Sequence, residues 1–288
     1  MRLNNIYQTA LLSGVLTCAL TSTAQSPDFH VELSPGHRLE SPGPMSHDAI
    51  VIVNDADRPI SIEAYRLVQR CQYGGTWEIT DASFLPRSTA ALMRQAGSRY
   101  WFDAIEIDKK ARFDTGLPNQ TCENARGAVE KAQNQIDAVI FTDGTYEGKE
   151  RAVRTLKAHR DGYSERLNYW ARRLKSEDPD GSGLNAMLGE ARCFVDADRA
   201  IMQDNSVDFF HFEFEPLLEK YSEGKLLVDK EVVEFLTHPE NSPVRSYHQL
   251  FGQITWRKGI FDSHASTKKL DVEFPPIFEP IRTCGPGA

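Results

Sequence analysis

The hydrophobic pattern of the chain changes its period near Gly148, and this change limits the possible fold more than any other feature. Before Gly148, short apolar runs rich in β-branched residues occur, and apolar and polar residues alternate in segments 60–67 and 105–108. After it, apolar side chains recur every three or four residues, which is the period of an α-helix. We therefore expect an α+β protein, with an N-terminal antiparallel β-sandwich-like domain followed by a mainly helical C-terminal domain.

The first two strand candidates form a predicted hairpin. A β-branched run at 49–53 is followed by the turn-forming residues 54–59 and by an alternating run at 60–67. Further strands are expected at 76–80, at 100–108 and at 134–141. Because no helix separates these strands, an antiparallel arrangement is favoured.

Two helices are predicted directly after the change of period. One apolar stripe runs from Val153 to Leu174, with Gly162 inside it, where glycine costs about 1 kcal/mol relative to alanine and could allow a bend. A second stripe runs from Leu184 to Met202, and the polar segment 177–183 separates the two. This pattern is typical of an antiparallel helical hairpin.

Two later helices are also expected. The cluster of apolar residues at 232–236 suits a short helix that ends before Pro239. Ser242 followed by Pro243 is a typical helix start, with serine as the N-cap and proline in the first position.

The composition of successive segments predicts the domain organisation. We expect a signal peptide at 1–24, a flexible linker rich in Pro, Gly and Ser at 25–47, a β-sandwich-like domain at 48–148, a helical domain at 149–270 and an irregular Pro-rich tail at 271–288.

The N-terminus has the features of an export signal. Arg2 precedes an apolar run of 12 residues at 9–20, and small residues then lead to Ala24, after which cleavage is expected. A run of this length is shorter than the roughly 20 residues needed to span a bilayer. We therefore expect a secreted or periplasmic protein with no transmembrane segment after signal removal. The alternative is a lipoprotein anchored through Cys18, although Thr17 departs from the residues usual before such a cysteine.

Signal removal leaves four cysteines, Cys71, Cys122, Cys193 and Cys284. Four cysteines in an exported chain allow three disulfide pairings. We favour Cys71 with Cys122, because both lie in the strand-rich half, which leaves Cys193 for Cys284. Four free, buried thiols are the alternative. The chain has no C-x-x-C or Cys/His cluster, so no structural zinc site is expected.

The charge of the chain limits its partners. The formal net charge is −8 and the pI is near 5.5, which argues against nucleic acid or an anionic membrane as the main partner. The long helix is nevertheless locally basic. Its arginines could dock an acidic partner or envelope phosphate, but we favour a solvated face paired with acidic neighbours. These arginines are Arg151, Arg154, Arg160, Arg166, Arg172 and Arg173.

One interhelix segment resembles a calcium loop. Asp178, Asp180 and Ser182 occupy positions 1, 3 and 5 of an EF-hand pattern. Position 12, which needs a bidentate carboxylate, is Gly189, and Glu190 comes one residue late. A polar turn between two helices is therefore the favoured interpretation.

Two other groups could support catalysis. His211, Glu213 and Glu215 would share one face of an extended segment and could bind a metal or act in acid–base chemistry, but Pro216 indicates a helix start instead. Ser222 and Lys225 match the S-x-x-K pattern of penicillin-recognising enzymes. That pair needs a helix, which Gly224 weakens, and the companion motifs are absent.

Two stretches carry a resemblance to other proteins. Segment 137–148, with the sequence D-A-V-I-F-T-D-G-T-Y-E-G, and segment 50–60 resemble uncharacterised secreted proteins of soil bacteria of the acidobacterial type. The resemblance implies a sandwich-like half that ends in a strand of the form D-A-V-I-F-x-D-G followed by a helix. It implies no activity, cofactor or catalytic residue.

These observations favour an exported, non-catalytic protein that binds an unknown protein or a cell-envelope component. No catalytic, cofactor-binding or metal-binding residue is assigned, and no cofactor is expected. The alternative is a hydrolase-type enzyme whose site is assembled from scattered acidic and His residues, with His211, Glu213 and Glu215 as candidates. A structural protein that self-associates is a third possibility.

Overall fold

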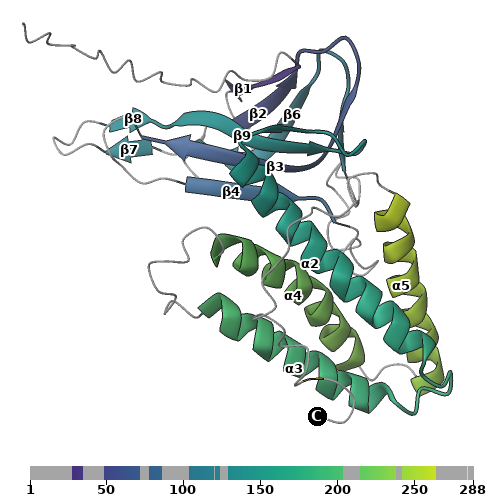
Figure 1. Cartoon of the computed structure of the whole chain (residues 1–288). Coiled ribbons are helices and arrows are strands. Elements are labelled where there is room, and N and C mark those ends of the chain that lie inside the picture. The colour runs from purple at the N-terminus through teal and green to yellow at the C-terminus, as the bar shows by residue number, and fades with distance from the viewer. Residues whose placement is uncertain are drawn as a thin grey trace, which may run out of the picture.

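The structure, a computed structural model, describes residues 28–34, 49–71, 78–85, 104–119, 121–123, 129–203, 215–237, 242–263 and 284. Antiparallel sheets form the N-terminal part of the chain and helices form the C-terminal part, so the α+β class expected from the sequence is confirmed (Figure 1). The expected signal peptide with its cleavage site at Ala24, the lipidation candidate Cys18, and the tail other than Cys284 lie outside the described residues.

Two antiparallel sheets face each other. The first has the strand order β1-β2-β6, and the second has the order β10-β9-β3-β4, with β5 also paired to β3. A small ribbon of β7 and β8 accompanies them. The strands of the first sheet are β1 (Phe29–Ser34), β2 (Ala49–Asn54) and β6 (Arg112–Pro118). The others are β3 (Ile60–Arg70), β4 (Glu78–Ser83), β5 (Ile105–Ile107), β7 (Thr121–Glu123), β8 (Val129–Lys131), β9 (Gln133–Phe141) and β10 (Tyr146–Gly148).

The two sheets share one apolar core, which gives the N-terminal half the form of a sandwich. Phe29, Ile50 and Ile52 from the first sheet pack with Ile62 and Val139 from the second. We refer to these two sheets as the sandwich. The burial of side chains from both sheets in one layer explains why the sequence alternates in the strands.

Two strand predictions are wrong. The segment expected to be a flexible linker contains β1, which pairs along its whole length with β2. Strands β2 and β3 do not form a hairpin but belong to different sheets. The connection between them is held by the fully buried side chain of Asn54, whose Nδ2 donates to the carbonyls of Ile107 and Asp108 at 3.0 and 3.1 Å. The turn residues after Asn54 therefore carry the chain from one sheet to the other.

Bulges in the two central strands let the second sheet bury both faces. The β3–β9 register shifts at Glu63 and again at Asp137. Because side chains alternate along a strand, each extra residue moves the following side chains to the other face. Ala138 and Ile140 consequently face away from the sandwich core and pack against Val153 of the first helix.

Four helices form the second half of the chain, which we call the helical half: α2 (Glu150–Lys175), α3 (Leu184–Gln203), α4 (Glu215–Thr237) and α5 (Pro243–Ser263). Figure 1 shows α2 leading from the sandwich into the helical half, with α3 and α4 on one side of it and α5 on the other. Helix α4 is longer than expected, because the predicted helix start near Pro216 and the predicted helix at 232–236 belong to one continuous helix.

Two disulfides have the pairing that the sequence favours. The Cα atoms of Cys71 and Cys122 are 5.7 Å apart, and those of Cys193 and Cys284 are 5.6 Å apart. The first disulfide lies in the sandwich half, and the second ties a residue of the C-terminal segment to α3. Two such pairs are consistent with an oxidising, extracellular or periplasmic location. None of the described helices combines the length and the apolar character needed to cross a membrane.

Candidate functional site

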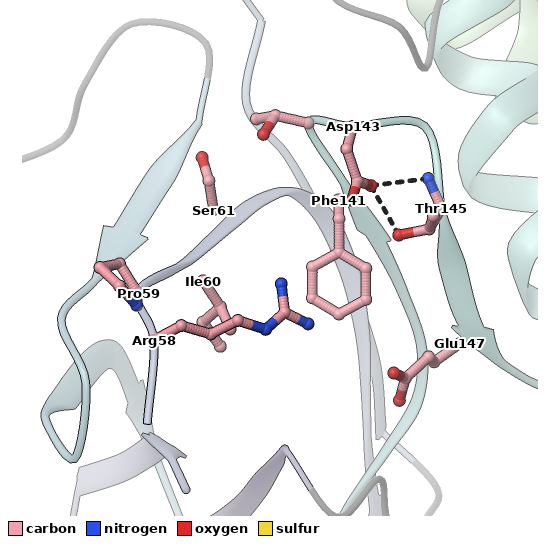
Figure 2. Close-up of a pocket in the computed structure, with 9 residues that line it drawn as sticks. Arg58, Pro59, Ile60, Ser61, Phe141, Asp143, Thr145 and Glu147 are labelled. Atoms are coloured by element: carbon pink, nitrogen blue, oxygen red, sulfur yellow. Dashed lines mark hydrogen bonds between the residues drawn. The ribbon is translucent and has the colours of Figure 1, made fainter. Parts of the chain in front are cut away.

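A hollow of about 180 Å³ lies at one end of the sandwich, where the β2–β3 connection meets the turn between β9 and β10. Figure 2 shows the Arg58 side chain reaching across it toward the ring of Phe141, with Asp143 and Glu147 on the far side. We call this feature the sandwich hollow. It is lined by Arg58, Pro59, Ile60, Ser61, Phe141, Thr142, Asp143, Thr145 and Glu147.

The first wall of the sandwich hollow is held by Asn54. Its Nδ2 donates to the carbonyl of Arg58 at 2.8 Å, and its Oδ1 accepts from the amide of Ala56 at 2.9 Å. A buried amide that satisfies the backbone in this way fixes a short loop in one conformation. Arg58 is thus presented from a rigid segment, although its own side chain is 70% exposed and, among the described residues, donates only to Asp28, at 3.2 Å.

The second wall is a tight turn built on Asp143. Its Oδ1 accepts from the amide of Thr145 at 2.8 Å and from the Thr145 hydroxyl at 2.6 Å (Figure 2). These two hydrogen bonds, with a smaller contribution from the charge of Arg58, hold the pKa of Asp143 below its ordinary value. Gly144 has a φ of 84°, a conformation that favours glycine. The Thr142 amide donates to the Ser61 carbonyl, which joins the two walls.

The sandwich hollow combines an apolar floor with polar groups of both kinds. Ile60 is buried, and the half-buried ring of Phe141 packs edge-on against Phe29, with ring centroids 6.3 Å apart. Around this floor stand one guanidinium, two carboxylates and the hydroxyl of Ser61. Such a surface can bind a small ligand through several hydrogen bonds while it covers an apolar face of that ligand.

A second, smaller crevice lies where the sandwich meets the helical half. It encloses about 20 Å³ and is lined by Asp81, Ser83, Thr155, Leu156, His159, Lys220 and Glu223. The Nδ1 of His159 and the Oγ of Ser83 are buried there and have no hydrogen-bond partner within the described part of the chain. Burial, opposed by the charge of Glu223, lowers the pKa of His159 to about 4. A crevice of this size has room for about one water molecule and none for a substrate.

Buried ion pairs attach α2 to the sandwich. The carboxylate of Glu63, on the bulge of β3, lies 2.9 Å from the guanidinium of Arg160, and both side chains are almost fully buried. The second bulge residue, Asp137, accepts from Lys149 Nζ at 2.8 and 2.9 Å. The bulge of β3 therefore places a carboxylate against the middle of α2. The bulge of β9 places a carboxylate against Lys149, directly before α2 begins.

A charged network also occupies the interior of the helical half. Arg166 on α2 lies 3.0 Å from Asp198 on α3 and 3.1 Å from Asp229 on α4. The ring of Phe194 covers its guanidinium at 3.8 Å. The indole of Trp170 donates to Asp229 at 2.7 Å. Because all these groups are buried among the helices, the network joins the helices to each other and offers no accessible site.

The buried arginines correct one expectation. A solvated basic face was expected on α2, but Arg160 and Arg166 are each only 4% exposed. Arg173 is also largely covered and pairs with Glu177 and Glu190. Arg151 and Arg172 do face solvent. The acidic partners of Arg160 and Arg166 lie far away in the sequence, which explains why helical periodicity alone could not assign them.

The structure describes only some of the catalytic candidates of the sequence. His211 and Glu213 lie outside the described residues, and Glu215 begins α4. Ser222 and Lys225 do lie on a helix, but both are buried, and Lys225 pairs with Glu165 at 3.1 Å.

The calcium-like segment forms a turn between α2 and α3. The Oδ1 of Asp180 accepts from the Ser182 amide at 2.8 Å, and the hydrogen bonds of Ser182 lower the pKa of Asp180. Glu190, which the calcium pattern would need as a ligand, pairs with Arg173. Within the residues that the structure describes, no group of three or more His, Cys, Asp or Glu side chains could hold a metal ion.

Comparisons of the chain with protein-family models, curated proteins and solved structures found no match. Its function must therefore be inferred from its own residues. Sequence reasoning identified both walls of the sandwich hollow only as turns, at 54–59 and at Asp143 and Gly144. The sequence does show a cation, Arg58, in one turn and a carboxylate, Asp143, in the other. Only the pairing of β3 with β9 shows that the two turns lie side by side.

Proposed function

We propose that the chain is an exported, non-catalytic binding protein that recognises a component of the cell envelope through the sandwich hollow. The observation that carries this proposal is the hollow itself, which presents Arg58 and Asp143 from two hydrogen-bonded turns and Glu147 from strand β10. Polar groups held in place before binding lose little entropy when a ligand arrives. The charged groups buried in the helical half are, by contrast, paired with one another.

Export is supported by the N-terminal signal pattern and by the two disulfides. The protein that reaches the periplasm or the medium is expected to begin at Gln25, after cleavage behind Ala24. Its mature form is therefore the form to use in a binding experiment.

The test is co-sedimentation of the purified mature protein with isolated cell envelopes. We expect binding to fall about tenfold or more when Arg58→Ala and Glu147→Gln are combined, because each removes a charged hydrogen-bonding group from the sandwich hollow. Arg112→Ala is the matched control, since Arg112 is a 60% exposed arginine of the sandwich that does not line the hollow. Equal binding by the hollow variant, the control and the wild type would contradict the proposal.

A further inference from the structure

We propose that the ligand of the sandwich hollow is a neutral, hydroxyl-rich molecule, such as one sugar unit of an envelope polysaccharide; this inference rests on the function proposed above. The first argument is the supply of both donors and acceptors. The Nη2 of Arg58 donates to Asp28, and its other nitrogens have no hydrogen-bond partner among the described residues. Asp143 uses only Oδ1 in its turn. Guanidinium groups only donate and carboxylates only accept, whereas a hydroxyl group can do both.

The second argument is the distribution of charge. One cation, Arg58, lines the sandwich hollow together with two carboxylates, Asp143 and Glu147, and Figure 2 shows its guanidinium between Ile60 and the ring of Phe141. An anionic ligand would meet both carboxylates, and a cationic ligand would be placed close to the guanidinium. A neutral polyol avoids both repulsions, because its hydroxyl groups accept from the guanidinium and donate to the carboxylates.

The third argument is the apolar floor. Pro59, Ile60 and the ring of Phe141 are the apolar groups that line the sandwich hollow. A sugar ring has C–H groups on its faces and hydroxyl groups at its edge, so one face can cover an aromatic ring while the edge forms hydrogen bonds. The sandwich hollow measures about 180 Å³, more than the cavity of about 150 Å³ that accommodates benzene, so it has room for a six-membered ring whose hydroxyl groups reach its rim.

The experiment is a titration of ¹⁵N-labelled mature protein followed by the backbone amide resonances of Ser61, Thr142 and Thr145. The probes are glucose, N-acetylglucosamine and a short oligosaccharide of the latter, and the charged comparison probes are lysine methyl ester and glucuronate. We expect the neutral sugars to shift these three amides at lower concentration than either charged probe. Glu147→Gln should weaken sugar binding by about tenfold, since it replaces a charged acceptor, while Arg112→Gln should leave it unchanged.

The outcomes separate the ligand class from the proposed function. If the sugars do not bind, or bind more weakly than a charged probe, and envelope binding still depends on Arg58 and Glu147, the ligand class is overturned and the binding function stands. If the sugars do not bind and envelope binding does not depend on Arg58 or Glu147, both proposals are overturned. Sugar-induced shifts spread over α3 or α5 instead of the sandwich hollow would also overturn the assignment.

Discussion

The sandwich and the helical half differ in what they bury. The shared core of the two sheets consists of apolar side chains such as Phe29 and Ile52. The sandwich also buries Asn54 and Glu63, but Asn54 holds the β2–β3 connection and Glu63 pairs with Arg160 of α2. The interior of the helical half contains Arg166, Asp198, Asp229 and Arg257 alongside its apolar residues, and each of them is at most 4% exposed. The same chain therefore uses two different ways of specifying its packing.

The difference follows from the backbone. A strand forms its hydrogen bonds with its neighbour, so the sheet itself determines which strands lie together. A helix forms its backbone hydrogen bonds within itself, and its side chains alone select its neighbours. In the helical half, Arg166 binds one acid on α3 and another on α4, which gives three helices a directional contact that apolar side chains do not provide.

Removal of the central cation should produce the largest effect. Arg166→Met leaves Asp198 and Asp229 buried without their cation, and we expect a loss of about 3–5 kcal/mol in the free energy of unfolding at pH 8. The matched variant in the sandwich is Arg112→Met, which breaks the ion pair between Arg112 and Glu32. The side chain of Arg112 is 60% exposed. That change should cost less than about 1 kcal/mol. Urea denaturation of both variants measures this difference. Similar losses in the free energy of unfolding would contradict the contrast between the sandwich and the helical half.

The crossing of α2 and α4 provides the next test. A Cβ at Gly224 would lie 1.9 Å from the His159 carbonyl oxygen, and a Cβ at Gly162 would lie 1.9 Å from the Tyr221 carbonyl oxygen. The backbones therefore touch, and Gly224→Ala should destabilise the protein by about 1–3 kcal/mol as the helices are forced apart.

The control for this variant is Gly189→Ala on α3, where a Cβ would meet nothing within 4 Å. Alanine favours a helix over glycine by up to about 1 kcal/mol, so this variant should be more stable than the wild type. Thermal unfolding of the two variants should move the midpoint in opposite directions. A stabilising effect of Gly224→Ala would contradict the close crossing.

The glycine at 162 illustrates what could be predicted from the sequence and what could not. The sequence identified the helix around it and the cost of glycine within it, because both depend on local pattern and propensity. Glycine is needed here because the backbone of α4 at Tyr221 passes close to it. Tyr221 is about 60 residues away in the sequence, and a local sequence pattern cannot reveal such a contact. The start of α5 at Pro243 was predictable for the opposite reason, since a helix N-terminus depends on adjacent residues alone.

The same division applies to the sheets and to the sandwich hollow. The apolar and β-branched runs located β3 and β9 closely, but they could not show that β2 and β3 separate into different sheets. The buried side chain of Asn54, which decides that separation, binds carbonyls more than 50 residues away. The two turns of the sandwich hollow could therefore be predicted from the sequence, whereas their position next to each other could not.

The smallest expected effects concern the change of the free energy of unfolding with pH. Burial raises the pKa of Asp229 from its ordinary value of 3.8 to about 7. Between about pH 4 and pH 7 the folded chain therefore binds more protons at this group than the unfolded chain does, and its contribution to stability falls as the pH rises. Asp229→Asn, which resembles the protonated acid, should remove this decline.

His159, at the crevice between the halves, should act in the opposite direction. Its pKa is lowered from 6.5 to about 4, mainly by burial, in an environment that includes Glu223, Lys220, Arg160 and Asp81. Between pH 6.5 and pH 4 the unfolded chain binds more protons at this group, so its contribution to stability falls as the pH falls. Relative to the wild type, His159→Gln should therefore gain stability toward pH 4.5, and Asp229→Asn should gain it toward pH 7.5. Urea denaturation at steps between these values measures both slopes, and parallel profiles for all three proteins would show that neither buried group titrates as its environment requires.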